Sequence, residues 1–310
     1  MENWQLGVEK MLKRNGSEQN MIKKQIQKTF KPLLAPRNSK LADVKPSSML
    51  NYYWRVVATG LSFATFGAGG VVIALVISPT VQLLNRDPEA RHVLAQKTIK
   101  YSFRSFVEMM RTLGIMTYDV QDVEKLENSY GELIVANHPT LIDVVMLIAF
   151  LPQANCVVKQ SLWTNPFTRG AVRSAGYILN RGSEQFIEDC VEKLSADQAG
   201  SLVIFPEGTR TEKGESLNKF QRGASNIAVR ANVPVRPVVI RCTPSTLTKN
   251  EKWYRVPKQP FHMELKVLDS VQISDIMPAT DLQKTDSHSK AVRQLNSWLF
   301  TFFENKLLGQ

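Results

Sequence analysis

The hydrophobic positions divide the chain into a charged start, one long uncharged segment and a region of alternating strand and helix patterns. No charged side chain occurs from Val56 to Asn85, and about 20 apolar residues suffice for a helix that crosses a bilayer. Tyr52, Tyr53 and Trp54 precede this segment, as aromatic residues do at a headgroup boundary. The pattern predicts a membrane helix, either as a single tilted span or as a re-entrant hairpin that turns at residues 67–70.

Basic segments lie on both sides of the uncharged run. Residues 1–50 form a basic arm, because Lys and Arg outnumber Asp and Glu there. From Pro88 to Gly114, apolar residues recur every three or four positions, which predicts an amphipathic helix. Two roles fit this helix: its basic side lies on an anionic bilayer surface, or the helix packs against the domain that follows. We assign residues 51–114 to membrane-associating helices.

From residue 115 to residue 310, short segments rich in Val and Ile alternate with helical patterns. The predicted strands are residues 132–137, 155–159, 177–180, 201–205, 235–241 and 261–268. This alternation predicts an α/β domain with a largely parallel sheet flanked by helices.

The net charge of +11 indicates an anionic partner: nucleic acid, a membrane surface or a phosphorylated substrate. No basic stripe interleaved with aromatic residues and no familiar nucleic-acid motif occurs, so we expect no nucleic acid. The cysteines at 156, 190 and 242 lie far apart, which predicts neither a disulfide framework nor a metal site.

Three polar clusters directly follow predicted strands, and ligand sites in open α/β sheets lie beyond the carboxyl ends of strands. The clusters comprise Asn137, His138 and Asp143; Arg181 and Gly182; and Glu207, Gly208, Thr209 and Arg210. We expect them to converge on one site, because they share one edge of the predicted sheet.

His138 and Asp143 have the residue types and spacing of a general base and its orienting carboxylate. A neutral imidazole can accept a proton from a hydroxyl near neutral pH, while a carboxylate holds its other ring nitrogen. A capping histidine beside a surface aspartate is the alternative interpretation. Arg210 offers a fork for phosphate oxygens, and Gly208 permits close backbone approach. A plain turn with a surface arginine is the alternative there.

Four blocks occur in order along this region. They are "NHPTLID" at 137–143, "GYILNR" at 176–181, "FPEGTR" at 205–210 and "VPVRPVV" at 233–239. Together with "VKQSLWTNPFTRG" at 158–170, they resemble the glycerolipid acyltransferase family, typified by 1-acylglycerol-3-phosphate acyltransferase. The resemblance covers about residues 130–245. It departs from the family pattern at Asn180, where Asp is common, and at Arg236, in a usually apolar stretch.

The resemblance implies a membrane-associated O-acyltransferase with His138 as base and Asp143 as its orienter. The base would deprotonate the free hydroxyl of a lysophospholipid or similar acceptor, whose oxygen then attacks an acyl thioester of coenzyme A or acyl carrier protein. The residues that would hold the acceptor phosphate and shape its pocket are Arg210, Arg181, Lys159, Glu207, Gly208 and Thr209. The thioester is a co-substrate, and the resemblance implies no cofactor and no metal.

The partners expected from this assignment are the lipid bilayer, a lysophospholipid acceptor and acyl-CoA or acyl carrier protein. The expected location is the inner, cytoplasmic membrane, with the catalytic domain on the cytoplasmic side. Two other enzymes fit: a phospholipid transacylase that needs no thioester, and an acyltransferase acting on a non-glycerol lipid. A basic membrane-binding protein without catalysis would explain the charge and the apolar segment, but not "NHPTLID" or "FPEGTR".

Overall fold

The computed structural model describes residues 49–310 except 183, 197–198, 277–286 and 309–310. The predicted basic arm therefore lies outside the described residues, apart from its last two positions. The helices are α2 (Met49–Val72), the π-helical segment η1 (Ile73–Ile77), α3 (Ser78–Leu84), α4 (Pro88–Thr112), α5 (Val123–Glu127), α6 (Asp143–Phe150), α7 (Gln160–Thr164), α8 (Arg169–Ser174), α9 (Glu184–Ser195), α10 (Gly223–Ala231), α11 (Ile273–Ile276) and α12 (Ser287–Leu308). The strands are β1 (Met116–Gln121), β2 (Leu133–Ala136), β3 (Ala154–Val158), β4 (Ile178–Leu179), β5 (Ser201–Ile204), β6 (Val235–Thr243) and β7 (Phe261–Val267).

The seven strands form one sheet in the order β1-β7-β6-β2-β5-β3-β4. Every neighbouring pair is parallel except β6 and β7. The fold is therefore α/β with a mostly parallel sheet, as the sequence predicts. The sequence pattern does not reveal β1, because this edge strand is only partly buried and carries polar residues.

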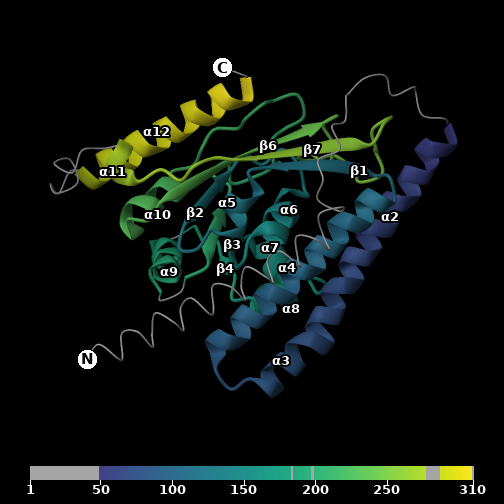
Figure 1. The fold of residues 1–310 in the computed structure, drawn as a ribbon, viewed down its shortest axis with the longest axis horizontal. Coiled ribbons are helices and arrows are strands. Elements are labelled where there is room, and N and C mark those ends of the chain that lie inside the picture. Colours follow the sequence, from purple (N-terminus) through teal and green to yellow (C-terminus); the bar gives the residue numbers. More distant parts are fainter. Residues whose placement is uncertain (1–48, 183, 197–198, 277–286, 309–310) are drawn as a thin grey trace, which may run out of the picture. The chain divides into compact units, whose positions relative to one another are not determined.

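Successive residues of each central strand point to opposite faces of the sheet, and each face has its own apolar core. In β2, Ile134 and Ala136 contribute to the core under α2, α4, α6 and α8. Leu133 and Val135 contribute to the opposite core, which α9, α10 and α12 cover. Figure 1 shows α12 on the far side of the sheet from α2 and α4.

The uncharged segment is a continuous helical rod rather than a hairpin, so the re-entrant turn predicted at residues 67–70 is wrong. Helix α2 continues through these glycines into η1 and α3. Gly70 permits a close approach to the turn before α8 instead, because a Cβ added there would lie 1.9 Å from the carbonyl oxygen of Phe167. Gly170 of α8 has a matching role, because a Cβ added there would lie 2.2 Å from the Cβ of Ala74 in η1.

Helix α4 packs against the domain, which is the second of the two roles expected for it. Asp87 caps its start by accepting hydrogen bonds from the backbone N–H groups of Glu89 and Ala90. Ile99, Val107 and Met110 are buried against α6 and α2. In Figure 1, α2 and α4 lie side by side along one flank of the sheet.

Arg236, one of the two departures from the family pattern, has a structural role at the amino end of β6. Its guanidinium donates to both carboxylate oxygens of Glu132, at 2.6 and 2.8 Å, and to the carbonyl of Leu268. Arg236 lies opposite Ile134 on the parallel strand β2, whereas His138 follows the carboxyl end of that strand. This departure therefore lies at the end of the sheet opposite to His138.

Candidate active site

The His138 ring is held by a buried carboxylate. Its Nδ1 lies 2.8 Å from Oδ2 of Asp143, which is fully buried in the first turn of α6. The same carboxylate oxygen accepts the backbone N–H of Thr140 at 2.8 Å. The chain therefore leaves β2, turns and re-enters as a helix in a way that returns Asp143 to the histidine. Asp143 is therefore a buried partner of the ring and not a surface aspartate, an arrangement that could serve a base with its orienting carboxylate.

The pairing determines which ring nitrogen is available for chemistry. Nδ1 carries a proton when it donates to Asp143, which leaves the Nε2 lone pair available as an acceptor. The ring also stacks on Phe205, with centroids 4.2 Å apart and an interplanar angle of 25°. Burial raises the pKa of Asp143 to about 6, opposed by its hydrogen bond to His138. Two contacts thus fix the imidazole orientation before any substrate arrives.

Glu207 ties the loop at residues 205–211 to the loop that carries the histidine. Its Oε1 accepts the backbone N–H of His138 at 2.7 Å. Its Oε2 accepts the hydroxyl of Thr211 at 3.0 Å and the backbone N–H of Asn218 at 2.9 Å. Burial raises the pKa of Glu207, and these hydrogen bonds act in the opposite direction. Both oxygens are occupied by the protein, so Glu207 holds the two loops together rather than lining the cavity.

Asn137 has a similar structural role one residue earlier. Its side chain donates to the carbonyl of Ile240 and accepts the backbone N–H of the same residue, each at 2.8 Å. It therefore continues the pairing of β2 with β6 at the point where the strands diverge.

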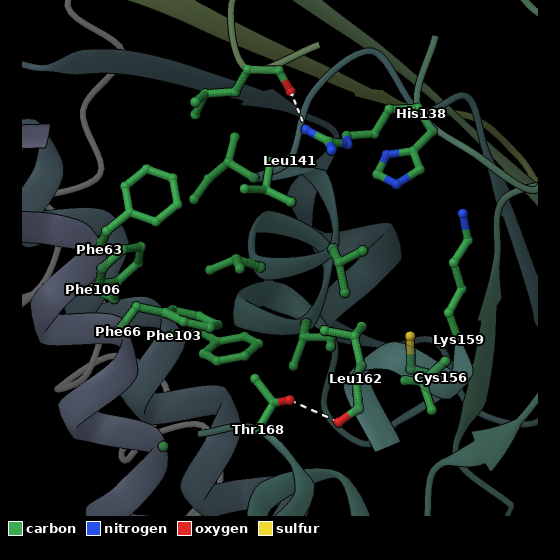
Figure 2. Close-up of a pocket in the computed structure, with 18 of the residues that line it drawn as sticks. Phe63, Phe66, Phe103, Phe106, His138, Leu141, Cys156, Lys159, Leu162 and Thr168 are labelled. Atoms are coloured by element: carbon green, nitrogen blue, oxygen red, sulfur yellow. Dashed lines mark hydrogen bonds between the residues drawn. The ribbon is translucent and has the colours of Figure 1, made fainter. Parts of the chain in front are cut away.

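His138 lies on the wall of a cavity of about 1090 Å³. Most of the wall is apolar and comes from α2, α4, α6, β3 and α8. Figure 2 shows Phe63, Phe66, Phe103 and Phe106 on the wall opposite Lys159. Cys156 also lines it, but burial raises the pKa of its thiol to about 12, so the group is not a thiolate near neutral pH.

Two cationic side chains border the same cavity. Arg210 donates from Nη1 to the carbonyls of Leu247 and Thr248, at 2.8 and 3.0 Å. Within the described part of the chain, the hydrogen bonds of this guanidinium involve Nη1 alone, which leaves Nε and Nη2 available for an anion. Lys159, at the start of α7, is exposed and extends toward the His138 side of the cavity (Figure 2). Together they give one end of an apolar cavity a positive charge.

Gly208 and Thr209 line the cavity beside Arg210. Gly208 has φ +67, a backbone conformation that residues with a Cβ rarely adopt, so the turn itself requires glycine here. The structure thus brings together His138, Lys159, Gly208, Thr209 and Arg210, with Asp143 and Glu207 directly behind them.

Arg181 is the exception among the predicted site residues. It lines a separate cavity of about 500 Å³ together with Asp189 and Lys193. Strand β4, which precedes it, is at the edge of the sheet, and β3 and β5 separate it from β2. The sequence reveals that Arg181 follows a strand, but not how far that strand lies from the histidine.

Comparison with known proteins finds similarity over the segment that carries most of these residues. Residues 117–241 match the family model described as Acyltransferase. These residues make up less than half of the chain, and they include His138, Asp143 and the loop at 205–211. The fold agrees, because 79% of this chain superposes on 97% of the 1-acyl-sn-glycerophosphate acyltransferase PlsC from Thermotoga maritima, with a TM-score of 0.55 and 23% identity.

Proteins similar to this chain occur in bacteria, fungi and animals. A 1-acyl-sn-glycerol-3-phosphate acyltransferase of Helicobacter pylori is 38% identical over 36% of this chain and 48% of its own length. The corresponding proteins of Saccharomyces cerevisiae and Homo sapiens (form beta) are 29% and 25% identical, over 63% and 61% of this chain. The matches span 48% of the bacterial relative, 62% of the yeast relative and 68% of the human one.

One segment of the candidate site could not be predicted from the sequence, the β6–β7 loop at residues 244–260. The carbonyl of Leu247 accepts both Nη1 of Arg210 and the backbone N–H of Leu141, in the loop between His138 and Asp143. Leu247 has φ +54, uncommon for a residue with a branched side chain, and its side chain lines the cavity. Neither periodicity nor motif spacing reveals an irregular loop of this kind.

Among the described residues, no group of three or more His, Cys, Asp or Glu side chains is placed to hold a metal ion.

Proposed function

We propose that the chain transfers a fatty acyl group from an acyl thioester to the free hydroxyl of a lysophospholipid such as 1-acylglycerol-3-phosphate. One observation carries the proposal: a carboxylate-oriented histidine lies on the wall of a large apolar cavity, with two cations at the same wall. The apolar part suits an acyl chain, the cations suit a phosphate, and the histidine suits a hydroxyl. The named activity of the relatives supports the same chemistry.

In the proposed mechanism, Nε2 of His138 accepts the proton of the acceptor hydroxyl. The hydroxyl oxygen forms a bond to the thioester carbonyl carbon, and the carbon–sulfur bond then breaks. The sulfur leaves as a thiol after it takes the proton back from the imidazolium. Asp143 stabilises the imidazolium that exists between these two proton transfers, because its carboxylate lies 2.8 Å from Nδ1.

Arg210 and Lys159 bind the acceptor phosphate in this mechanism. Arg210 is partly restrained by Leu247 and Thr248, so little side-chain entropy is lost when its remaining N–H groups meet an anion. The walls contributed by α2 and α4 hold an acyl chain in apolar surroundings. Coenzyme A and acyl carrier protein both present the thioester that this chemistry needs.

The lipid acceptor explains the exposed apolar surface of α2. Residues Met49–Leu83 form a helical rod long and apolar enough to cross a membrane, by length and composition. One face of the rod packs on the domain, and Trp54, Val57, Leu61 and Leu75 are exposed on another. The exposed face lies in the bilayer, with the catalytic domain on the cytoplasmic side of the inner membrane.

The decisive experiment offers the purified protein 1-acylglycerol-3-phosphate with labelled acyl-CoA or acyl carrier protein, while thiol release is followed in parallel. We expect acylated lipid and thiol in equal amounts, and a turnover roughly 10²–10⁴-fold lower in His138→Ala, since positioned bases contribute about that much. Acylated lipid without thiol would show a transacylase instead. Unchanged turnover in a folded His138→Ala protein would refute the mechanism. If the wild-type protein acylates no lipid, the interpretation as a membrane-binding protein without catalysis is favoured instead.

A further inference from the structure

The second half of the β6–β7 loop presents aromatic and basic side chains to solvent. Trp253 and Tyr254 are adjacent and each 44% exposed. Lys252, Arg255 and Lys258 flank them and are also exposed. The one acidic residue of this stretch, Glu251, points inward, where it accepts from the backbone N–H of Thr248 and pairs with Lys213. The outward charge of the segment is therefore positive.

This segment is bound directly to α2. Arg55 of that helix is buried and donates to the carbonyls of Pro257 and Lys258, at 3.2 and 2.6 Å. The ring of Trp253 lies against α2, because a Cβ added at Gly60 would be 3.2 Å from it. Phe63, whose ring centroid is 6.0 Å from that of Trp253, both lines the cavity and remains exposed. The loop therefore lies at the flank of α2, between its packed face and its exposed apolar face.

From these contacts we infer that the β6–β7 loop is a second membrane-docking element, which places Trp253 and Tyr254 in the headgroup region of an anionic bilayer. Aromatic rings with a polar edge favour that region, and nearby Lys and Arg residues are attracted to anionic lipids. The surface is continuous with the apolar face of α2, so both would meet the same bilayer. The inference rests on the proposed membrane attachment of α2, but not on the proposed acyl transfer.

Docking of this loop has a consequence for the site. The same loop holds Arg210 through the carbonyls of Leu247 and Thr248, six residues or fewer from Trp253. The cavity wall also includes Trp253, Val256 and Pro257. An element that contacts headgroups and also holds the anion site places Arg210 near the depth at which a lysophospholipid carries its phosphate.

The test uses three of the five tryptophans of the chain as depth reporters. Three variants each retain one tryptophan, at 54, 253 or 298, with the others replaced by phenylalanine, and are reconstituted into vesicles of phosphatidylcholine and phosphatidylglycerol. Some vesicles carry lipids brominated near the glycerol, which quench fluorescence on contact. Trp298 lies on α12, on the opposite face of the sheet, and serves as the negative control.

We expect quenching of Trp54 and Trp253 and none of Trp298. Quenching of Trp54 alone would refute loop docking and leave the membrane attachment of α2 intact. Quenching of neither would refute both. The quenching experiment does not depend on acyl transfer. The docking of the loop and the proposed reaction are therefore tested independently, and either can be refuted without the other.

A charge test follows in the variant that retains Trp253. Lys252→Gln with Arg255→Gln removes two basic residues beside the rings, which predicts roughly 10- to 30-fold weaker attachment of the loop to anionic lipid and hence less quenching. Lys266→Gln with Arg293→Gln removes the same charge from exposed positions on β7 and α12 and should leave quenching unchanged. Equal losses in both pairs would overturn the specific role of the loop.

A second measurement covers the case in which multiple tryptophan replacements prevent folding, which circular dichroism would reveal. Tyr254→Cys carries a nitroxide label in a Cys242→Ala background, because the other two native cysteines are buried. We expect protection of the label from a water-soluble nickel chelate when vesicles are added. Full access of the chelate in membrane-bound protein would refute the docking.

Discussion

Asp143→Asn separates the stability of the site from its chemistry, because the carboxylate is fully buried and shared by two donors. Oδ2 accepts from His138 and from the backbone of Thr140, while Oδ1 has no hydrogen-bond partner among the described residues. An asparagine keeps both hydrogen bonds if its carbonyl oxygen takes the place of Oδ2. The histidine then keeps its tautomer and loses only the negative charge that stabilises its imidazolium.

The magnitude follows from the pKa of Asp143, raised by burial from 3.8 to about 6. Each pKa unit corresponds to 1.36 kcal/mol, so ionising this group in the folded protein costs about 3 kcal/mol relative to the unfolded chain. A raised folded-state pKa means that the contribution to stability is complete below about pH 4 and is lost as pH rises through about 6. Asparagine has no such loss.

The assay is unfolding in detergent micelles at several pH values, for wild type and Asp143→Asn. We expect the stability of the variant relative to wild type to rise by about 3 kcal/mol between about pH 4 and about pH 7, while turnover falls by roughly 10²–10⁴-fold. The unpartnered amide N–H₂ adds an offset of roughly 1–3 kcal/mol that does not depend on pH. Glu188→Gln, exposed on α9, is the control. A stability difference that stays constant with pH would refute the assigned burial effect, and full activity would refute the role of the charge.

Three further changes test other parts of the structure. Arg210→Ala should raise the KM for the acceptor more than it lowers kcat. Arg210→Lys should not restore the acceptor KM fully, because lysine lacks the bidentate fork. An increase confined to the KM for the acyl donor would assign this pocket to the donor instead. Glu207→Ala should destabilise the fold by roughly 3 kcal/mol or more in denaturant unfolding, because one buried and two part-buried donors lose their acceptor; a smaller change would mean that water replaces the carboxylate. Gly70→Ala should lower the melting temperature by forcing the new Cβ against the carbonyl of Phe167, whereas Gly69→Ala, with no atom within 4 Å, should not; equal effects would contradict the packing between α2 and α8.

The sequence was sufficient for the parts of the fold that depend on local pattern. Val- and Ile-rich strands alternating with helices predicted a mostly parallel α/β sheet, and that prediction is confirmed. The pattern predicted His138 and Asp143 as a pair because both lie on one short strand–turn–helix unit, where spacing along the chain limits distance in space. The hydrogen bond between them needs no knowledge of the other strands.

Features that depend on contacts between distant segments could not be predicted from the local sequence pattern. Arg181 follows a strand just as His138 does, but its strand is at the sheet edge, so it lines another cavity. The glycines at 67–70 have the composition of a turn, and only the close approach of Phe167 shows that Gly70 serves helix packing. The role of Leu247 depends on a backbone carbonyl, which carries no signal in the sequence.

The proposed base and the proposed anion site belong to one hydrogen-bonded unit, which limits how independently they can respond to mutation. The backbone of His138 donates to Glu207 and accepts from Thr211, and the following loop donates through Leu141 to the carbonyl that also accepts from Arg210. Three segments distant in the sequence thus fix the base relative to the cation before substrates bind. A displacement of a catalytic group by about 1 Å can lower a reaction rate by roughly 10²-fold. The backbone hydrogen bonds of this unit are therefore expected to influence the reaction as strongly as the side chains that would touch the substrate. It also predicts that Arg210→Ala and Glu207→Ala will show non-additive losses of kcat/KM when combined, since each loosens the same loops.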